Sequence, residues 1–133
     1  MFEIIPFKRF GQFEFNKNID PYLIGVQYDF CPKEEGESWD TYSFGSGILD
    51  IYTAEGIIES ISCRGDCYLE GIMLIGMSIF VFETTFNISL SLIKKEQVYF
   101  YDDSMQEVYE VESLGLQIWV DHNNVIVTVI AYS

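Results

Sequence analysis

A weak internal duplication constrains the fold of this chain more than any other feature of its sequence. The segment 48–63 contains two runs of β-branched and aromatic residues around a short glycine-containing turn, and the segment 115–131 repeats this arrangement. Matched positions are Leu49 with Leu116, Ile51 with Ile118, Tyr52 with Trp119, Ile57 with Val125 and Ile61 with Val129. The offset is 67 residues before the turn and 68 after it, because the second turn is one residue longer. Both segments are typical of β-hairpins.

Further strand-like runs precede each hairpin at comparable places. Residues 38–44 precede the first hairpin, and residues 107–111 precede the second. A run at 97–101 ends in a turn-forming sequence, and we expect its counterpart in the first half at 25–30. These runs predict four strands in each half of the chain.

Each half is also predicted to open with a short helix. Asn16 and Ser78 are favourable N-cap residues, and each follows a segment that contains glycine. Two observations oppose helices here: Pro21 interrupts the first copy, and residues 80–85 prefer strands. The duplication decides in favour of helices.

The predicted fold class is therefore α+β, with a mostly antiparallel sheet built from two tandem helix-plus-strand repeats. We expect a single domain over residues 1–133, with pseudo-repeats at about 1–68 and 69–133. Neither repeat can bury its apolar face well alone, so the two are expected to pack together around one core.

Charge is the strongest functional signal in the sequence. Twenty-one Asp and Glu oppose seven Lys and Arg, which gives a formal net charge of −14, and residues 96–133 contain no Lys or Arg. Such a field repels phosphate backbones and anionic lipids, which argues against nucleic-acid and membrane binding, and it attracts basic proteins. Solubility alone is the competing explanation.

The location predicted from the sequence is cytoplasmic. The first residues lack the basic-then-apolar pattern of a secretory signal, and the longest apolar stretch, 72–82, is too short to span a bilayer. Three cysteines argue against a complete disulfide framework. Whether Cys63 and Cys67 form a disulfide with each other is left open.

No motif of a catalytic or metal site stands out. The single histidine, His122, lies in a predicted turn, where turn formation explains it better than catalysis does. Cys63 and Cys67 lack the spacing and the partners of a zinc site, and the acidic pairs lack the ligand pattern of a calcium loop. We therefore predict no enzyme activity, no cofactor and no bound metal.

Two acidic segments with aromatic residues are the candidate contact surfaces. Interfaces take much of their binding energy from buried Trp and Tyr, while the surrounding charges select the partner. The predicted partner-binding residues are Glu34, Glu35, Glu37, Trp39 and Asp40 in one segment, and Tyr99, Tyr101, Asp102, Asp103, Glu107, Tyr109 and Glu110 in the other.

The chain resembles known families in two respects. Its size, acidity and aromatic-rich strands resemble bacterial immunity proteins that neutralise toxins, including those of contact-dependent growth inhibition systems. Separately, the segment Gly76-Met77-Ser78 followed by a helix and a sheet is similar to the repeat unit of beta-lactamase inhibitory protein. The first resemblance implies a cytoplasmic antitoxin that occludes the active site of a basic, nuclease-like toxin. The alternative is a self-associating scaffold domain that forms a homodimer, and a small enzyme using its carboxylates and cysteines ranks third.

Overall fold

The larger of two sheets in the protein contains eight antiparallel strands. The computed structural model describes residues 2–133, which form one compact, mostly β body. The strands of the large sheet are β4 (Asp29–Cys31), β5 (Asp40–Phe44), β6 (Leu49–Ala54), β7 (Ile57–Cys63), β10 (Lys95–Tyr99), β11 (Met105–Val111), β12 (Leu116–Val120) and β13 (Ile126–Tyr132). Their order in space is β10-β11-β12-β13-β7-β6-β5-β4. Both predicted hairpins are confirmed, and a strand lies before each at the places expected, although β4 begins only at Asp29 and β10 ends at Tyr99.

Strand pairing repeats between the two halves of the large sheet. Tyr52 and Trp119, which match in sequence, each precede a β-bulge at the same place in their hairpin. The halves meet where β7 and β13 pair antiparallel. At this junction Ser62 pairs with Ile130, which lies 68 positions further along the chain. This separation equals the repeat offset, so the two paired residues are equivalent positions of the two halves.

The small sheet has five strands and was not predicted. Its order is β3-β2-β1-β8-β9, with β1 (Phe2–Ile5), β2 (Arg9–Phe10), β3 (Phe13–Glu14), β8 (Cys67–Leu69) and β9 (Ile72–Met73). It is mixed, because β1 runs antiparallel to β2 and parallel to β8. The core lies between this sheet and the large one. Its fully buried side chains include Ile4, Phe10, Ile51, Ile61, Ile118 and Ile126.

The helix prediction is confirmed in the second half only. Helix α1 (Ile79–Thr85) begins after Ser78, whose side chain accepts a hydrogen bond from the Phe80 amide. The first half has only a 3-10 turn, η1 (Asp20–Leu23). Gly25 adopts a left-handed conformation soon after this turn and directs the chain away. Two more 3-10 turns, η2 (Leu90–Leu92) and η3 (Glu112–Leu114), complete the structure.

The predicted capping role of Asn16 is wrong, and Asn18 takes that place. Asn18 bridges to the first hairpin as Ser78 bridges to the second, and its side chain accepts a hydrogen bond from the amide two residues later. Asn16 instead has a φ of +65° and matches Gly76, which has a φ of +91°. The amide of each donates a 2.8 Å hydrogen bond to the hairpin that follows in its own half.

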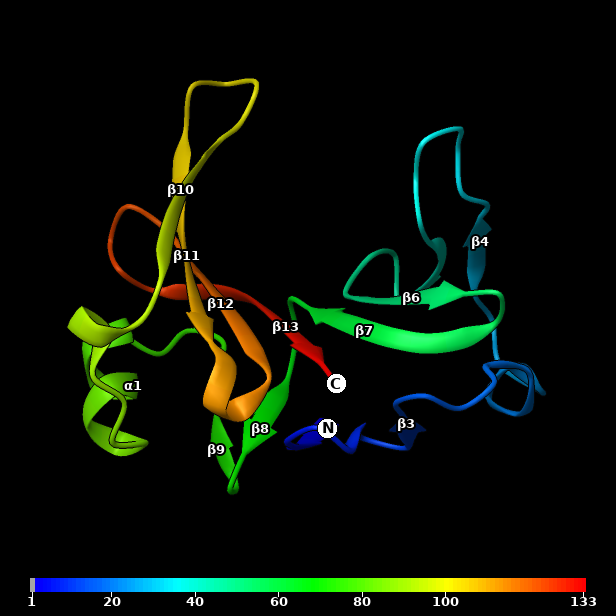
Figure 1. Cartoon of the computed structure of the whole chain (residues 1–133), viewed down its shortest axis with the longest axis horizontal. Coiled ribbons are helices and arrows are strands. Elements are labelled where there is room, and N and C mark those ends of the chain that lie inside the picture. Colours follow the sequence, from blue (N-terminus) through cyan, green and yellow to red (C-terminus); the bar gives the residue numbers. More distant parts are fainter. Residues whose placement is uncertain (1) are drawn as a thin grey trace.

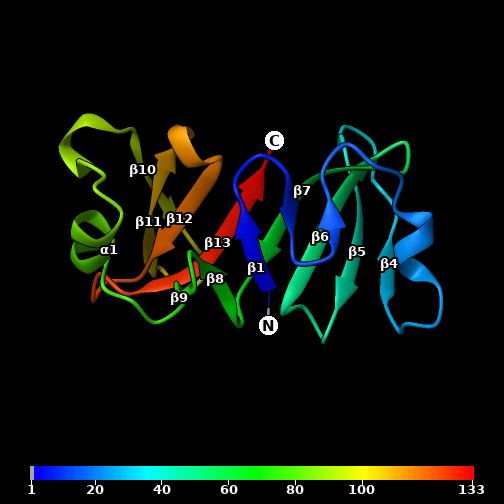
Figure 2. The same cartoon turned by 90° about the horizontal axis from the view of Figure 1, so that it is seen from below.

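The two ends of the large sheet rise on the same side of the molecule. Figure 1 shows the β4–β5 and β10–β11 hairpins at opposite ends, both pointing away from the small sheet. From below, β7 and β13 lie at the centre, with β1 and β8 in front of them (Figure 2). We call the face of the large sheet that points away from the small sheet the outer face. Within residues 2–133, no helix has the length and apolar character needed to cross a membrane.

Candidate protein-binding face

Strand alternation makes the outer face. Along β6, Leu49 and Ile51 are buried toward the small sheet, so Asp50 and Tyr52 point the opposite way and are partly exposed. The same alternation applies in β12, and in β7 and β13 a β-bulge interrupts it. The central side chains of the outer face are Tyr52, Ser60, Ser62, Gln117, Trp119, Thr128, Ile130 and Tyr132. The face therefore combines aromatic rings with hydroxyl and amide groups.

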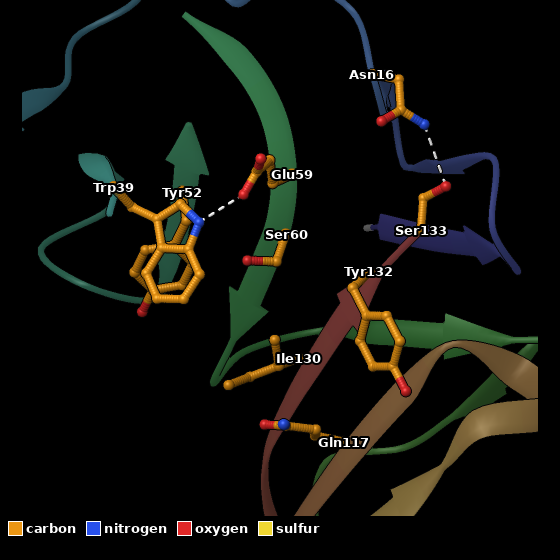
Figure 3. A pocket seen from close by; sticks show the side chains of 9 residues that line it. All are labelled: Asn16, Trp39, Tyr52, Glu59, Ser60, Gln117, Ile130, Tyr132 and Ser133. Carbon is orange, nitrogen blue, oxygen red and sulfur yellow. Dashed lines mark hydrogen bonds between the residues drawn. The ribbon is translucent and has the colours of Figure 1, made fainter. Parts of the chain in front are cut away.

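The larger hollow of the outer face is an open cavity of about 650 Å³, within the usual size range of binding pockets. We call it the Trp39 pocket; its lining is Asn16, Trp39, Tyr52, Glu59, Ser60, Gln117, Ile130, Tyr132 and Ser133 (Figure 3). The indole N–H of Trp39 donates a 2.6 Å hydrogen bond to Oε2 of Glu59. The Trp39 and Tyr52 rings lie 6.3 Å apart, and Tyr132 stands on the other side of the pocket (Figure 3).

A smaller hollow lies beside it and shares Tyr52 and Ile130. This Arg64 pocket encloses about 250 Å³, just below the usual range for binding pockets. It is lined by Tyr52, Ser62, Arg64, Phe100, Gln106, Trp119, Thr128 and Ile130. The Arg64 guanidinium donates a hydrogen bond to the Gly47 carbonyl and lies 3.7 Å from Asp50. Burial, and then the charge of Asp50, raises the pKa of Tyr52, while Arg64 opposes this shift.

The first predicted acidic segment forms the loop between β4 and β5, residues 32–39. Glu34, Glu35 and Glu37 are exposed there. Asp40 is half-buried at the start of β5 and accepts a 2.8 Å hydrogen bond from the Lys33 amide, so its carboxylate shapes the loop. Trp39 is 45% exposed and lies against the outer face. This loop therefore presents three free carboxylates above an aromatic side chain.

The second acidic segment is divided between a loop and a strand. Tyr101 and Asp103 are exposed in the loop between β10 and β11, residues 100–104, and Tyr99 is exposed at the end of β10. Asp102 accepts hydrogen bonds from the hydroxyl and the amide of Ser104, which lower the pKa of its carboxyl. These four side chains form one accessible group at the tip of the hairpin.

The strand residues of that segment point in two directions. Tyr109 lies in the core with 7% of its surface exposed, and Glu107 pairs with Lys95 at 2.9 Å on the same side of β11. Glu110 faces the outer side, where its Oε1 accepts a 2.6 Å hydrogen bond from Gln117. Of the three, only Glu110 belongs to the outer face.

The structure brings the two acidic loops to the same side of the molecule, at opposite ends of the outer face (Figure 1). Each loop also sends an aromatic residue onto this face: Trp39 lines one pocket, and Phe100 lines the other. The floor between them, with Tyr52, Trp119 and Tyr132, was not predicted as a site. The alternation of residues along the hairpin strands showed that each strand has two different faces. The sequence alone did not show which of these faces would stay open to a partner.

The residues considered for chemistry are placed differently. His122 is exposed in the β12–β13 turn. Cys63 and Cys67 are free thiols, both fully buried, and a hydrogen bond between them lowers the pKa of Cys63 and raises that of Cys67. No three His, Cys, Asp or Glu side chains of residues 2–133 gather in a way that could hold a metal ion.

Comparisons with known proteins leave the structure as the basis for inferring function. The chain matches no protein-family model, no curated protein and no solved structure.

Proposed function

We propose that this protein is an immunity-type inhibitor that binds a basic, nuclease-like toxin across its outer face and blocks the toxin's active site. One observation carries this proposal: two acidic loops stand at opposite ends of the outer face (Figure 1), and this face holds two pockets lined by aromatic residues. Carboxylates at both ends would orient and attract a basic partner, and the aromatic floor between them would supply contact area.

The proposed mechanism is steric occlusion. A formal net charge of −14 accelerates the encounter with a basic protein, and this acceleration weakens as salt rises. Once the partner is in place, Trp39, Tyr52 and Trp119 would lose contact with water and slow its release. No reacting group of the inhibitor takes part.

We also infer that the two halves descend from one duplicated unit. The repeated strand pairings, the two equivalent bulges and the equivalent bridges of Asn18 and Ser78 support this inference. The two copies join side by side through β7 and β13 and form one extended face with a similar hairpin at each end. An extended face of this kind suits a protein partner.

The test is a binding measurement with the product of the neighbouring gene, which the proposal predicts to be a basic toxin. The variant Glu34→Gln/Glu35→Gln/Glu37→Gln removes three charges from the first acidic loop. The matched control, Glu14→Gln/Asp66→Asn/Glu70→Gln, removes three exposed charges near the small sheet. We expect the loop variant to slow association by about tenfold at low salt and the control by less than about twofold. Equal effects of the two variants, or no binding of the unaltered protein, would contradict the proposal.

Self-association through a sheet edge is the second candidate. Strand β10 lies at one edge of the large sheet and is mostly exposed, but it begins with Lys95 next to Lys94, and charged residues protect edges from pairing. Light scattering decides between the two functions, because an edge-paired homodimer would persist whether or not a toxin is added.

A further inference from the structure

The two pockets of the outer face are counterparts of each other. Offsets of 67 and 68 residues, taken from the strand pairing, relate Trp39 to Gln106, Tyr52 to Trp119 and Tyr132 to Arg64. Ser60 and Ile130 correspond to Thr128 and Ser62 in the same way, so five members of the Trp39 pocket have counterparts in the Arg64 pocket. The pockets have the same framework, but the place of the Arg64 guanidinium in one is taken by a tyrosine in the other.

In the Arg64 pocket the chain supplies its own cation. Arg64 lies beside Asp50 and lines the pocket together with Tyr52 and Trp119. The Asp50 carboxylate attracts the guanidinium, whose side chain is 55% exposed.

The Trp39 pocket also has a carboxylate and aromatic rings but no cation; its carboxylate, Glu59, has no counterpart in the Arg64 pocket, and Gln117 stands at the position that matches Asp50. Glu59 is the one carboxylate side chain among the residues that line the Trp39 pocket, and none of these residues is Lys or Arg. Oε2 of Glu59 accepts the Trp39 indole N–H, while Oε1 makes no hydrogen bond within residues 2–133. One carboxylate oxygen is therefore available to a ligand.

The polar groups around this carboxylate also favour a donor. Gln117 gives one amide N–H to Glu110, because a carboxylate only accepts, and its amide oxygen and second N–H are left for the pocket. Burial, and then the charges of Glu110 and Glu112, raises the pKa of Tyr132. The pocket thus offers acceptors and ring faces in a negative field.

We propose that the Trp39 pocket binds the side chain of an arginine on the partner protein, with the guanidinium at Glu59 and between the rings of Trp39 and Tyr132. This inference rests on the proposed function and names the partner group that the outer face recognises. A cavity of about 650 Å³ has room for an arginine side chain and part of the segment that carries it. Planar guanidinium suits this site better than ammonium does, because it stacks on rings and presents several N–H donors.

The test titrates the full chain with N-acetyl-arginine amide and follows the Trp indole N–H signals by NMR. N-acetyl-citrulline amide is the control ligand, because it has nearly the same shape and no charge. We expect the Trp39 signal to shift with a dissociation constant of roughly 1–20 mM, typical of a single weak anchor. We expect citrulline to bind at least about tenfold more weakly. Loss of one indole signal in Trp119→Phe assigns the other to Trp39.

Two single-charge variants make the test specific. Glu59→Gln should weaken arginine binding by about fivefold, whereas Glu55→Gln removes an equal charge from the exposed turn between β6 and β7 and should change it by less than about 1.5-fold. Equal shifts with arginine and citrulline, or equal effects of the two variants, would overturn the arginine site.

The outcome for the arginine site is separable from that for the partner-binding face. If Glu59→Gln binds the basic toxin as tightly as the unaltered protein does, the arginine anchor is wrong while the proposed function stands. If arginine binds the Trp39 pocket but no basic toxin binds the protein, the proposed function fails and the pocket remains an arginine site.

Discussion

The Trp39 indole N–H donates to the carboxylate of Glu59 at 2.6 Å, and this bond joins the first acidic loop to strand β7. A hydrogen bond to a charged acceptor is stronger than one between neutral groups. Both side chains are exposed, however, so much of its strength is lost to competition with water. The bond therefore positions the loop more than it stabilises the fold.

We expect Trp39→Phe to loosen the loop with little effect on global stability. The free energy of unfolding should change by less than about 1 kcal/mol, because an exposed hydrogen bond contributes little. Exchange of the Lys33 amide, which is bonded to Asp40, should become several times faster. Hydrogen-exchange NMR and urea unfolding measure the two effects. As a control, Tyr101→Ala removes a fully exposed side chain and should alter neither quantity.

The matched core positions Ile51 and Ile118 should respond alike to truncation. Both are fully buried and occupy equivalent places in β6 and β12. Each change to Ala should cost about 2–5 kcal/mol, and the two losses should agree within about 1 kcal/mol. Denaturant unfolding provides the comparison. Ile24→Ala, at a residue 82% exposed, should shift stability by less than about 0.5 kcal/mol. A large difference between the two core variants would show that the halves are packed differently.

Ser78→Ala should destabilise the start of α1. The Ser78 side chain accepts a hydrogen bond from the Phe80 amide at 3.2 Å, and loss of an N-cap typically costs about 1 kcal/mol. Amide exchange at the first turn of the helix and chemical denaturation should both report the loss. Ser78→Asp keeps an acceptor at this place and should retain most of the stability. If Ser78→Asp were as unstable as Ser78→Ala, the cap would not be the cause.

Thiol reactivity tests the placement of the three cysteines. Cys31 is exposed, whereas Cys63 and Cys67 are free and fully buried. The folded protein should therefore react rapidly with one equivalent of a thiol reagent such as dithionitrobenzoate, and Cys31→Ser should abolish this fast phase. Unfolding in urea, without reductant, should release the other two thiols. If they failed to react there, Cys63 and Cys67 would form a disulfide.

Hairpins were predictable from the sequence because their information is local. Periodicity of two and the turn residues identified both hairpins and the strands before them, and Ser78 marked the start of α1. The small sheet could not be found in this way. Strands β2, β3 and β9 are two residues long, too short to show a period, and β1 pairs with β8 across more than sixty residues of chain.

Tertiary structure also decided which of two similar residues caps a turn. Asn16 and Asn18 both have good capping chemistry, but the bridge between Asn18 and Ile57 places Asn18 at the turn and leaves Asn16 at a positive φ. In the same way, the pattern around Tyr109 allowed either face of β11 to be exposed. Packing against the core buried that side chain.

The sequence by itself determined two hairpins of matching pattern, an excess of negative charge and two acidic aromatic segments. Only the tertiary structure decided that these segments share one side of the molecule. The physical reason is the antiparallel pairing of β7 with β13, which relates the halves by a rotation and sends equivalent loops to opposite ends of one sheet. The small sheet then covers the other face, so the face that holds both pockets stays open.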